Sequence, residues 1–261
     1  MSDEPHRPVV RTSTRGRVLV VTIDRPEARN AINHAVAVGL ERAIDQLEAD
    51  DDLWVGVLAA TPPIFCAGAD LKEVAAHGMA PLVTERGGFG GFVRRQRNKP
   101  VIAALDGNAL GGGLELALAA DLIVARSGVS VLLPEVTRSL LAVGGALAEL
   151  PRLVGEKVAL EIALTGTPIS VERLFDLGLV NRIATTGSAV DGAVELAEII
   201  CANAPLAVRA SRRAIVAGRQ LDEGQRWAYA EAQLGPLEVT ADYAEGLRAF
   251  AEKRPPEWTA R

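Results

Sequence analysis

The 261-residue sequence is poor in cysteine, histidine and aromatic residues, with two Cys, three His and 4% Phe, Trp and Tyr. Cys66 and Cys201 are too few for a disulfide-stapled secreted domain and form no close-spaced metal pair. We therefore expect a cytoplasmic location and no metal site. Three histidines, one of them in the N-terminal tail, also argue against a protease-like Ser/His/Asp set.

Long apolar runs and an excess of positive charge are missing as well. A membrane-spanning helix needs about 18 consecutive apolar residues, and the most apolar stretch, residues 114–125, is interrupted by Glu115 and Asp121. The first ten residues have no apolar core of the kind that a signal peptide requires. The net charge is −5, whereas nucleic-acid binders normally have a basic face. We expect neither a membrane nor a nucleic acid as a partner.

The composition that remains is that of a globular α/β protein. Hydrophobic residues make up 49% and charged residues 23% of the chain, which excludes disorder. Continuous apolar runs of strand length alternate with an amphipathic segment over residues 31–49, a pattern typical of buried parallel strands linked by helices. We predict strands at 9–12, 18–23, 55–60, 101–105 and 122–125, and helices at 31–49 and 114–120.

The last third of the sequence is predicted to be helical. Apolar residues recur there at helical spacing in six segments, 158–164, 171–177, 189–202, 206–217, 221–234 and 241–253. Before it, the glycine-rich residues 87–91 suggest a mobile turn between two charged helical pieces within the arginine-rich segment 72–99.

Two glycine-containing loops follow two of the predicted strands. Residues 65–70 (FCAGAD) come after the strand at 55–60, and residues 108–113 (NALGGG) come after the strand at 101–105. Loops at the carboxyl ends of parallel strands present free backbone N–H groups beside helix N-termini, which suits an anionic ligand atom. Each loop alone can equally be a tight turn. Neither matches a Walker or dinucleotide fingerprint, so the motifs give no support for phosphate binding.

Two isolated glutamates stand near these loops in the sequence. Glu115 lies within an apolar helical segment, and Glu135 follows the apolar run 129–134. A buried carboxylate is costly unless it is partnered, and its pKa is often raised into the range that suits proton transfer. Each could form a structural salt bridge or cap a helix. As a pair beside two donor loops, they favour an acid/base couple.

In these segments the sequence resembles the enoyl-CoA hydratase/isomerase (crotonase) superfamily. The resemblance implies an α/β crotonase-like fold of repeated ββα units, a spiral core with parallel sheets over residues 1–195. It also implies a helical region at 196–261 that builds a homotrimer or a dimer of trimers. The matching segments follow the family's order over nearly the whole chain: 23–31 (IDRPEARNA), 65–71 (FCAGADL), 106–116 (DGNALGGGLEL), Asp121, 134–135 (PE), 164–166 (LTG), 175–182 (FDLGLVNR) and 245–254 (EGLRAFAEKR).

The family's activity would be syn addition of water to a trans-2-enoyl-CoA, a hydro-lyase reaction of the fatty acid β-oxidation type. The resemblance assigns an oxyanion hole to the N–H groups of Ala69 and Gly112. It makes Glu135 the protonating acid and Glu115 the water-orienting base, although the residues alone leave these two roles interchangeable. Coenzyme A enters as part of the substrate thioester, and no other cofactor is implied.

The resemblance also places coenzyme A along two early motifs and a C-terminal helix. The matching positions are Ala28, Arg29, Ala67, Gly68, Asp70, Leu71, Phe250 and Lys253, the last two often supplied by a neighbouring subunit. Asp70 has a second, local role as the cap of the helix that starts at Leu71. Arg25 could meet a phosphate or be a solvated loop charge. Cys66 is expected to be a small buried hydrophobe, and His34 and His77 are expected at the surface.

The sequence is also compatible with other functions. Double-bond isomerisation or another acyl-CoA reaction uses the same enolate-stabilising scaffold. A non-catalytic acyl-CoA-binding protein could use it too. Leu133 stands where hydratases often have a polar residue, and the loop 136–145 lacks a proline that many members have, so the acyl group is not fixed by the sequence.

Overall fold

A six-stranded sheet forms the centre of the structure, a computed structural model that describes residues 8–261. In sheet order its strands are β1 (Val10–Arg15), β2 (Val18–Ile23), β3 (Val55–Ala60), β7 (Val101–Leu105), β9 (Leu122–Arg126) and β12 (Arg182–Ala184). β1 is antiparallel to β2, and all other neighbours are parallel. β3 and β7 are buried along their whole length, as their continuous apolar runs predict.

A smaller four-stranded sheet carries the loops of interest. Its order is β11 (Ile169–Ser170), β10 (Ser130–Leu132), β8 (Asn108–Leu110) and β4 (Ile64–Cys66). β4, β8 and β10 are parallel, and β11 is antiparallel to β10. In chain order, each of β3, β7 and β9 is followed by one of these short strands and then by helical structure. This is the repeated ββα arrangement of a crotonase fold, and the predicted fold class is confirmed.

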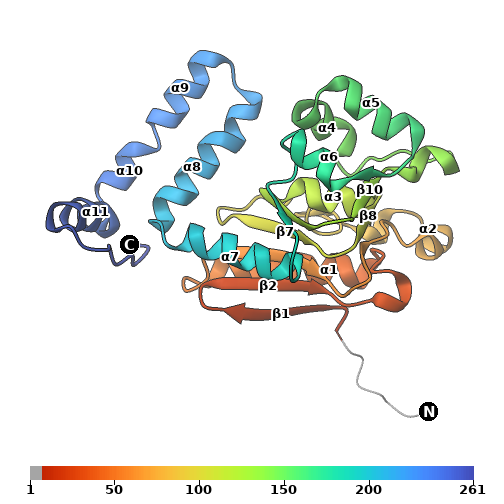
Figure 1. Cartoon of the computed structure of the whole chain (residues 1–261), viewed down its shortest axis with the longest axis horizontal. Helices are drawn as coiled ribbons and strands as arrows, with labels where there is room; N and C mark the ends of the chain where they lie inside the picture. The colour runs from red at the N-terminus through yellow and green to blue at the C-terminus, as the bar shows by residue number, and fades with distance from the viewer. Residues whose placement is uncertain (1–7) are drawn as a thin grey trace, which may run out of the picture.

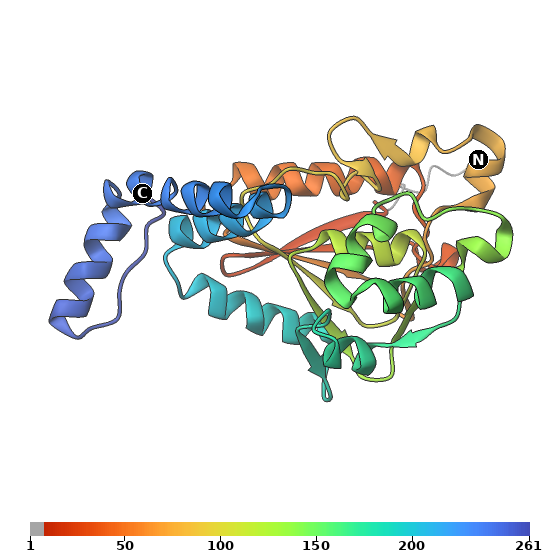
Figure 2. The ribbon, with the colours of Figure 1, turned by 90° about the horizontal axis from the view of Figure 1, so that it is seen from above.

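Helices cover both faces of the large sheet. α7 (Ala189–Cys201) packs on one face, and α1 (His34–Ala49) and the small sheet lie on the other (Figures 1 and 2). The strand–helix units are completed by α2 (Leu71–His77) and α3 (Gly112–Ala119). α4 (Ala146–Val154), α5 (Glu156–Thr165) and α6 (Val171–Asp176) stack above α3 in Figure 1.

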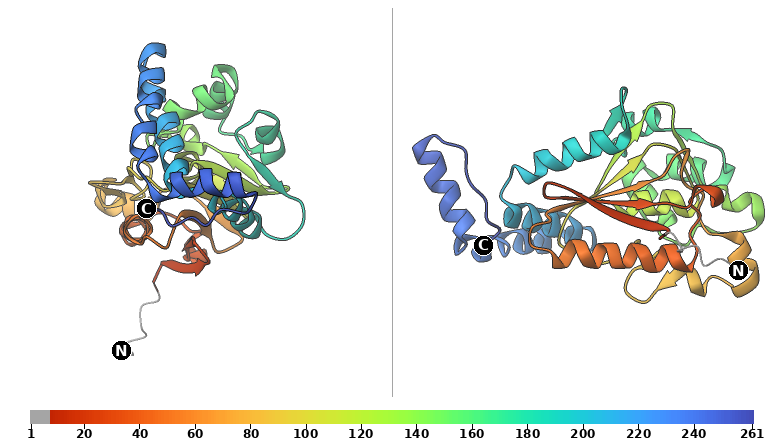
Figure 3. Two further views of the ribbon diagram at one scale, coloured as in Figure 1. Left: turned by 90° about the vertical axis from the view of Figure 1, so that its left-hand side faces the viewer. Right: turned by 90° about the horizontal axis from the view of Figure 1, so that it is seen from below.

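The C-terminal helices project from one end of this core. They are α8 (Pro205–Ala217), α9 (Glu223–Glu231), α10 (Leu234–Glu238) and α11 (Ala241–Glu252). Figures 1 to 3 show α9 to α11 standing away from the sheets, on the side opposite α2. The end of the chain folds back onto α11, where Thr259 N donates to Asp242 at 2.8 Å. Trp258 Nε1 donates to the carbonyl of Ala202, directly after α7, at 2.9 Å. The predicted helical C-terminal region is therefore present.

Several sequence predictions are corrected by the structure. The glycine-rich residues 87–91 are buried and form part of a hairpin between β5 (Val83–Thr84) and β6 (Gly88–Phe89), so they are not a loose turn between two helical pieces. Helix α1 starts at His34 rather than at residue 31, because Asn33 caps it by accepting from Val36 N. The single helix predicted at 221–234 is divided between α9 and α10. Short 3₁₀ helices occur at Pro26–Ala28, Ala80–Leu82, Pro134–Arg138 and Gly218–Gln220.

Within residues 8–261, no helix is long and apolar enough to cross a membrane, and no cluster of three His, Cys, Asp or Glu is placed to hold a metal ion. Most of the N-terminal segment in which no signal peptide was expected lies outside the described residues.

Candidate active site

The two glycine loops meet at the ends of β4 and β8. Gly68 has a φ of +85°, and a Cβ built there would lie 2.9 Å from Gly112 N and 3.0 Å from Leu110 O. A Cβ on Gly113 would lie 2.2 Å from Cys66 O. Only glycine allows backbone to approach backbone this closely, because any larger residue would push the loops apart. The glycines therefore make a rigid junction.

Two amide groups at this junction are free to bind a ligand. Ile32 N donates to Gly68 O at 2.8 Å and Asp70 N donates to Ile32 O at 2.9 Å, which fixes the strand-like segment around Ala69. Gly112 is the first residue of α3, where a helix has no internal acceptor for its N–H. Within residues 8–261, neither Ala69 N–H nor Gly112 N–H has an acceptor. Both N–H groups are therefore available as donors at this junction.

Glu115 lies in the first turn of α3 and is only 4% exposed. Its Oε1 accepts a hydrogen bond from Ala146 N at 3.2 Å, and the backbone of Gly144 and Gly145 also donates to the carboxylate. Burial raises the pKa of Glu115 to about 7, because these hydrogen bonds offset the desolvation only in part and the nearby Glu135 carboxylate adds repulsion. Glu115 can therefore change protonation state near neutral pH.

Glu135 lies in the 3₁₀ helix after β10, directly over the second glycine loop. A Cβ on Gly111 would come within 2.6 Å of Glu135 Oε1. Burial raises the pKa of Glu135 above its ordinary value. Its Oε2 is buried and has no hydrogen-bond partner among the described residues. A buried acceptor of this kind requires a partner, which a water or a ligand can provide.

The two early segments that are predicted to hold coenzyme A also lie side by side. Ala67 N donates to the carbonyl of Arg29 at 3.1 Å, and the fully buried Asn30 donates to the carbonyls of Thr61 and Ile64. Ala28 precedes this contact in the chain. The other predicted positions come directly after Ala67 in the chain: Gly68, Asp70 and Leu71, of which Leu71 is 47% exposed. The predicted positions at residues 28–29 and 67–71 thus border one surface next to the donor loops.

Asp70 has a structural role in this surface. It caps α2 by accepting from Lys72 N at 3.1 Å, as predicted, and Arg25 Nη1 donates to it at 2.6 Å. Burial alone would raise the pKa of Asp70, but the Arg25 guanidinium and the backbone donors outweigh burial and lower the pKa. The alternative of a solvated loop charge for Arg25 is therefore wrong, because its side chain is 20% exposed and paired.

Phe250 and Lys253 are not brought to this site within the chain. They lie in and directly after α11, at the end of the molecule opposite α2 (Figures 1 and 2). Phe250 is 87% exposed.

The remaining predictions for single residues are confirmed. Cys66 is fully buried beside the donor loop, where burial raises the pKa of its thiol to about 12, and His34 and His77 are exposed.

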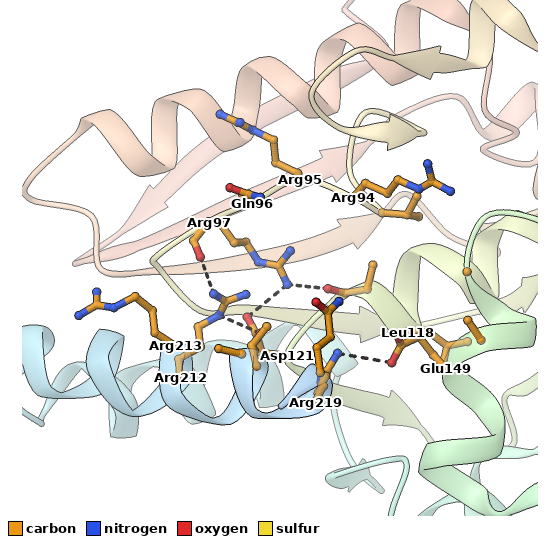
Figure 4. Close-up of a pocket in the computed structure, with 18 of the residues that line it drawn as sticks. Arg94, Arg95, Gln96, Arg97, Leu118, Asp121, Glu149, Arg212, Arg213 and Arg219 are labelled. Atoms are coloured by element: carbon orange, nitrogen blue, oxygen red, sulfur yellow. Dashed lines mark hydrogen bonds and ion pairs between the residues drawn. The ribbon is translucent and has the colours of Figure 1, made fainter. Parts of the chain in front are cut away.

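A cavity of about 1000 Å³ is lined by Glu115 and by residues of α8. Figure 4 shows Arg212 and Arg213 of α8 at this cavity. Gly144 and Gly145 line it next to Glu115. Sequence reasoning missed both the backbone donors of residues 144–146 and the arginines of this cavity. The runs RRQR at 94–97 and RR at 212–213 were the available signal for the arginines, but only the fold brings the two runs together.

The ββα fold, the two free N–H groups and the paired glutamates define an acyl-CoA enzyme of the crotonase type. The sequence matches the model of the enoyl-CoA hydratase/isomerase family over residues 13–261, and the chain belongs to this family. Its relatives and its fold make it an enzyme of the enoyl-CoA hydratase type, a hydro-lyase.

Individual relatives differ in the acyl group that they are named for. An enoyl-CoA hydratase structure from Mycobacterium tuberculosis H37Rv is 46% identical, with a TM-score of 0.93 over 98% of this chain and 100% of that one. A mevalonyl-coenzyme A hydratase from Aspergillus fumigatus is 37% identical over 92% of this chain and 91% of its own. A carnitinyl-CoA dehydratase from Proteus mirabilis is also 37% identical, over 95% and 97%. The relatives do not point to a single acyl group.

Proposed function

We propose that the protein adds water in a syn manner across the double bond of a trans-2-enoyl-CoA, giving a 3-hydroxyacyl-CoA. The observation that carries this proposal is the pair of buried glutamates, Glu115 and Glu135, both with raised pKa values, beside two backbone N–H groups without acceptors. Both carboxylates are retained, which favours hydration over isomerisation, a reaction that needs no activated water.

The free amides supply the stabilisation of the thioester oxygen. Water attack at C3 turns the thioester carbonyl into an enolate oxygen, and Ala69 N–H and Gly112 N–H would donate to it. The positive end of α3 adds to this stabilisation because Gly112 is its first residue. Each fixed donor of this kind is typically worth about 3 kcal/mol in the transition state.

The glutamates would hold and deprotonate the water and supply the second proton. Glu115, held by backbone donors from residues 144–146, accepts a proton from the water as its oxygen bonds to C3. Glu135 then gives its proton to C2 of the enolate. The proton that Glu115 took from the water passes back to Glu135, directly or through solvent, so that one water is added in total and both glutamates return to their starting states. The buried Oε2 of Glu135, which has no acceptor or donor within residues 8–261, suits a second contact with that water.

Coenzyme A would lie on the surface formed by residues 28–29 and 67–71, with the exposed Arg29 available to a phosphate. We also propose that residues 196–261 are the trimerisation region and that a neighbouring subunit supplies Phe250 and Lys253. Large apolar side chains are exposed on this region, as expected for an interface: Ile215, Trp227, Val239, Leu247 and Phe250. The position of α11 away from the core supports an assembly of several chains, and we propose a trimer or a dimer of trimers.

A panel of trans-2-enoyl-CoA thioesters of different length and tail chemistry tests the proposed reaction. The enone absorbance should fall on addition of the enzyme for at least one of them, with formation of the 3-hydroxy product. If the thioesters bind but none loses its enone absorbance, the protein is an acyl-CoA-binding protein and the proposal is wrong.

A further inference from the structure

The cavity beside Glu115 is rich in arginine. Six arginines line it against three carboxylates, those of Glu115, Asp121 and Glu149. Few large apolar side chains are present, the main ones being Val93, Leu118 and Val216. A cavity for a long saturated chain would instead have mostly aliphatic walls. The six arginines are Arg94, Arg95, Arg97, Arg212, Arg213 and Arg219 (Figure 4).

A pair of these arginines shares one carboxylate in the middle of the cavity. Arg97 Nη2 lies 3.3 Å and Arg212 Nε 2.8 Å from Asp121, each from a different oxygen. The side chain of Arg97 is 4% exposed, and its Nε donates to no acceptor in residues 8–261. Two guanidinium groups with a single counter-charge leave the interior of the cavity positive, and water screens little of this charge because the groups are buried.

Two further arginines are available to a ligand. Arg94 is exposed and has no carboxylate partner within residues 8–261, and its stem packs against Gly88. Within residues 8–261, the one ion pair of Arg219 is that with Glu149, at 3.4 Å, and both side chains are partly exposed. An exposed ion pair of this length contributes little to stability, so Arg219 can readily exchange Glu149 for the carboxylate of a ligand. By contrast, Arg95 forms an ion pair with Asp45 of α1. Arg213 Nε donates a hydrogen bond to the side-chain amide oxygen of Gln233.

We propose that the enzyme takes an enoyl-CoA whose acyl chain ends in a carboxylate, and that Arg94 and Arg219 bind this carboxylate in the cavity. The inference rests on the proposed function, because it assumes that the thioester carbonyl is held at Ala69 and Gly112. The acyl chain then passes Glu115 and enters the positive cavity. Guanidinium groups bind carboxylates in bidentate fashion, which gives the site its selectivity. A tail with a quaternary ammonium group would be repelled.

Matched pairs of thioesters isolate the contribution of the terminal charge. trans-2-Hexenedioyl-CoA and trans-2-hexenoyl-CoA have the same length and differ in the terminal carboxylate, and the eight-carbon pair repeats the comparison. We expect kcat/KM to be about tenfold higher for the dicarboxylic member, since hydrogen bonds between charged groups are stronger than those between neutral groups. Equal or lower values for the dicarboxylic members at both lengths would overturn the inference while leaving hydration intact.

Binding separates this inference from the proposed reaction. The saturated thioesters hexanedioyl-CoA and hexanoyl-CoA cannot be hydrated, and calorimetry should give a dissociation constant about tenfold lower for the dicarboxylic one. That preference would support the inference even if no enoyl thioester were hydrated, a result that would overturn the proposed function alone. Equal affinities would overturn the inference.

Variants assign the preference to the two arginines. Arg94→Gln and Arg219→Gln should each reduce the dicarboxylic-to-neutral ratio of kcat/KM several-fold, mainly through KM. Glu149→Gln removes the carboxylate that competes for Arg219 and should raise the ratio. Arg173→Gln is the matched control, because Arg173 is also paired with a single glutamate, Glu161, but lies outside the cavity. A ratio that stays the same in the Arg94 and Arg219 variants would contradict their assignment.

Discussion

At the scale of single residues, two kinds of buried carboxylate are distinguished by their partners. Asp121 has two arginine partners, and Asp70 is paired with Arg25; these guanidinium groups outweigh desolvation and lower the pKa of each aspartate. Glu115 and Glu135 have no arginine or lysine within hydrogen-bonding distance in the described chain, and burial raises the pKa of each. Glu115 stands among leucines and alanines, so the sequence predicts that it is buried. The sequence does not show whether an arginine or lysine lies beside its carboxylate. The arginines that pair the aspartates come from distant parts of the chain.

The raised pKa of Glu115 predicts a cost in stability. Between the ordinary pKa of 4.5 and about 7, folded Glu115 holds a proton that the unfolded chain has released, so the free energy of unfolding falls as pH rises through this window. A shift from 4.5 to about 7 corresponds to about 3 kcal/mol. Glu115→Gln should therefore stabilise the protein at pH 8 relative to the wild type, and much less at pH 5.

Urea unfolding of both proteins at the two pH values measures this difference. The control is Glu161→Gln, because Glu161 is exposed and the Arg173 guanidinium lowers its pKa, so its removal should not stabilise at pH 8. Equal stability differences for Glu115→Gln at pH 5 and pH 8 would show that the pKa of Glu115 is not raised.

At the scale of elements, the long buried strands are predictable and the short ones are not. Strands β2, β3 and β7 follow from apolar runs of five or six residues. β4, β8 and β10 have three residues each, which is too short to show a periodic pattern of hydrophobic residues. These short strands carry the loops of the site. Their pairing, and the close approach of Gly68 to Gly112, depend on tertiary contacts between distant segments, which the sequence does not show.

Substitution of Gly68 by Ala tests the junction between the two loops. The new Cβ would lie 2.9 Å from Gly112 N, so the loops must separate and the two donors lose their common target. We expect kcat to fall by about 10²-fold, the typical effect of one lost oxyanion donor. Gly128→Ala is the matched control, since Gly128 has a similar φ of +80° but nothing within 4 Å of its Cβ position.

The control should lose about 1 kcal/mol of stability and keep its kcat. If both variants retain wild-type kcat, the close approach of the two loops is not required for catalysis. Steady-state kinetics together with urea unfolding distinguish these results.

At the scale of the whole molecule, the catalytic core and the C-terminal helices have different surfaces. The core buries its large apolar residues in two clusters on the two faces of the sheet. Helices α8 to α11 leave Ile215, Trp227 and Phe250 largely exposed. A helical region is predictable from the periodicity of residues 206–253, but periodicity does not tell an internal core from a subunit interface. The structure places these side chains outside the core.

Light scattering after size-exclusion chromatography tests the proposed trimer. We expect a mass of three or six chains for the wild type. Ile215→Asp and Phe250→Asp should reduce it, because each places a charge in an apolar interface. Leu164→Asp, at the end of α5, changes a side chain that is 69% exposed outside the C-terminal region and should leave the mass unchanged. A monomeric wild-type protein would contradict the trimer.

Hydration by Glu115 and Glu135 can be tested by following the stereochemistry of the product and the rate of its formation together. Wild type, Glu115→Gln and Glu135→Gln are assayed with the best thioester of the panel in deuterated water, and NMR identifies the product. We expect one 2-deuterio-3-hydroxyacyl-CoA diastereomer, that of syn addition, from the wild type. We expect a rate about 10²- to 10⁴-fold lower in each variant, with thioester binding largely retained. Wild-type rates in either variant, or a mixture of diastereomers, would contradict this mechanism.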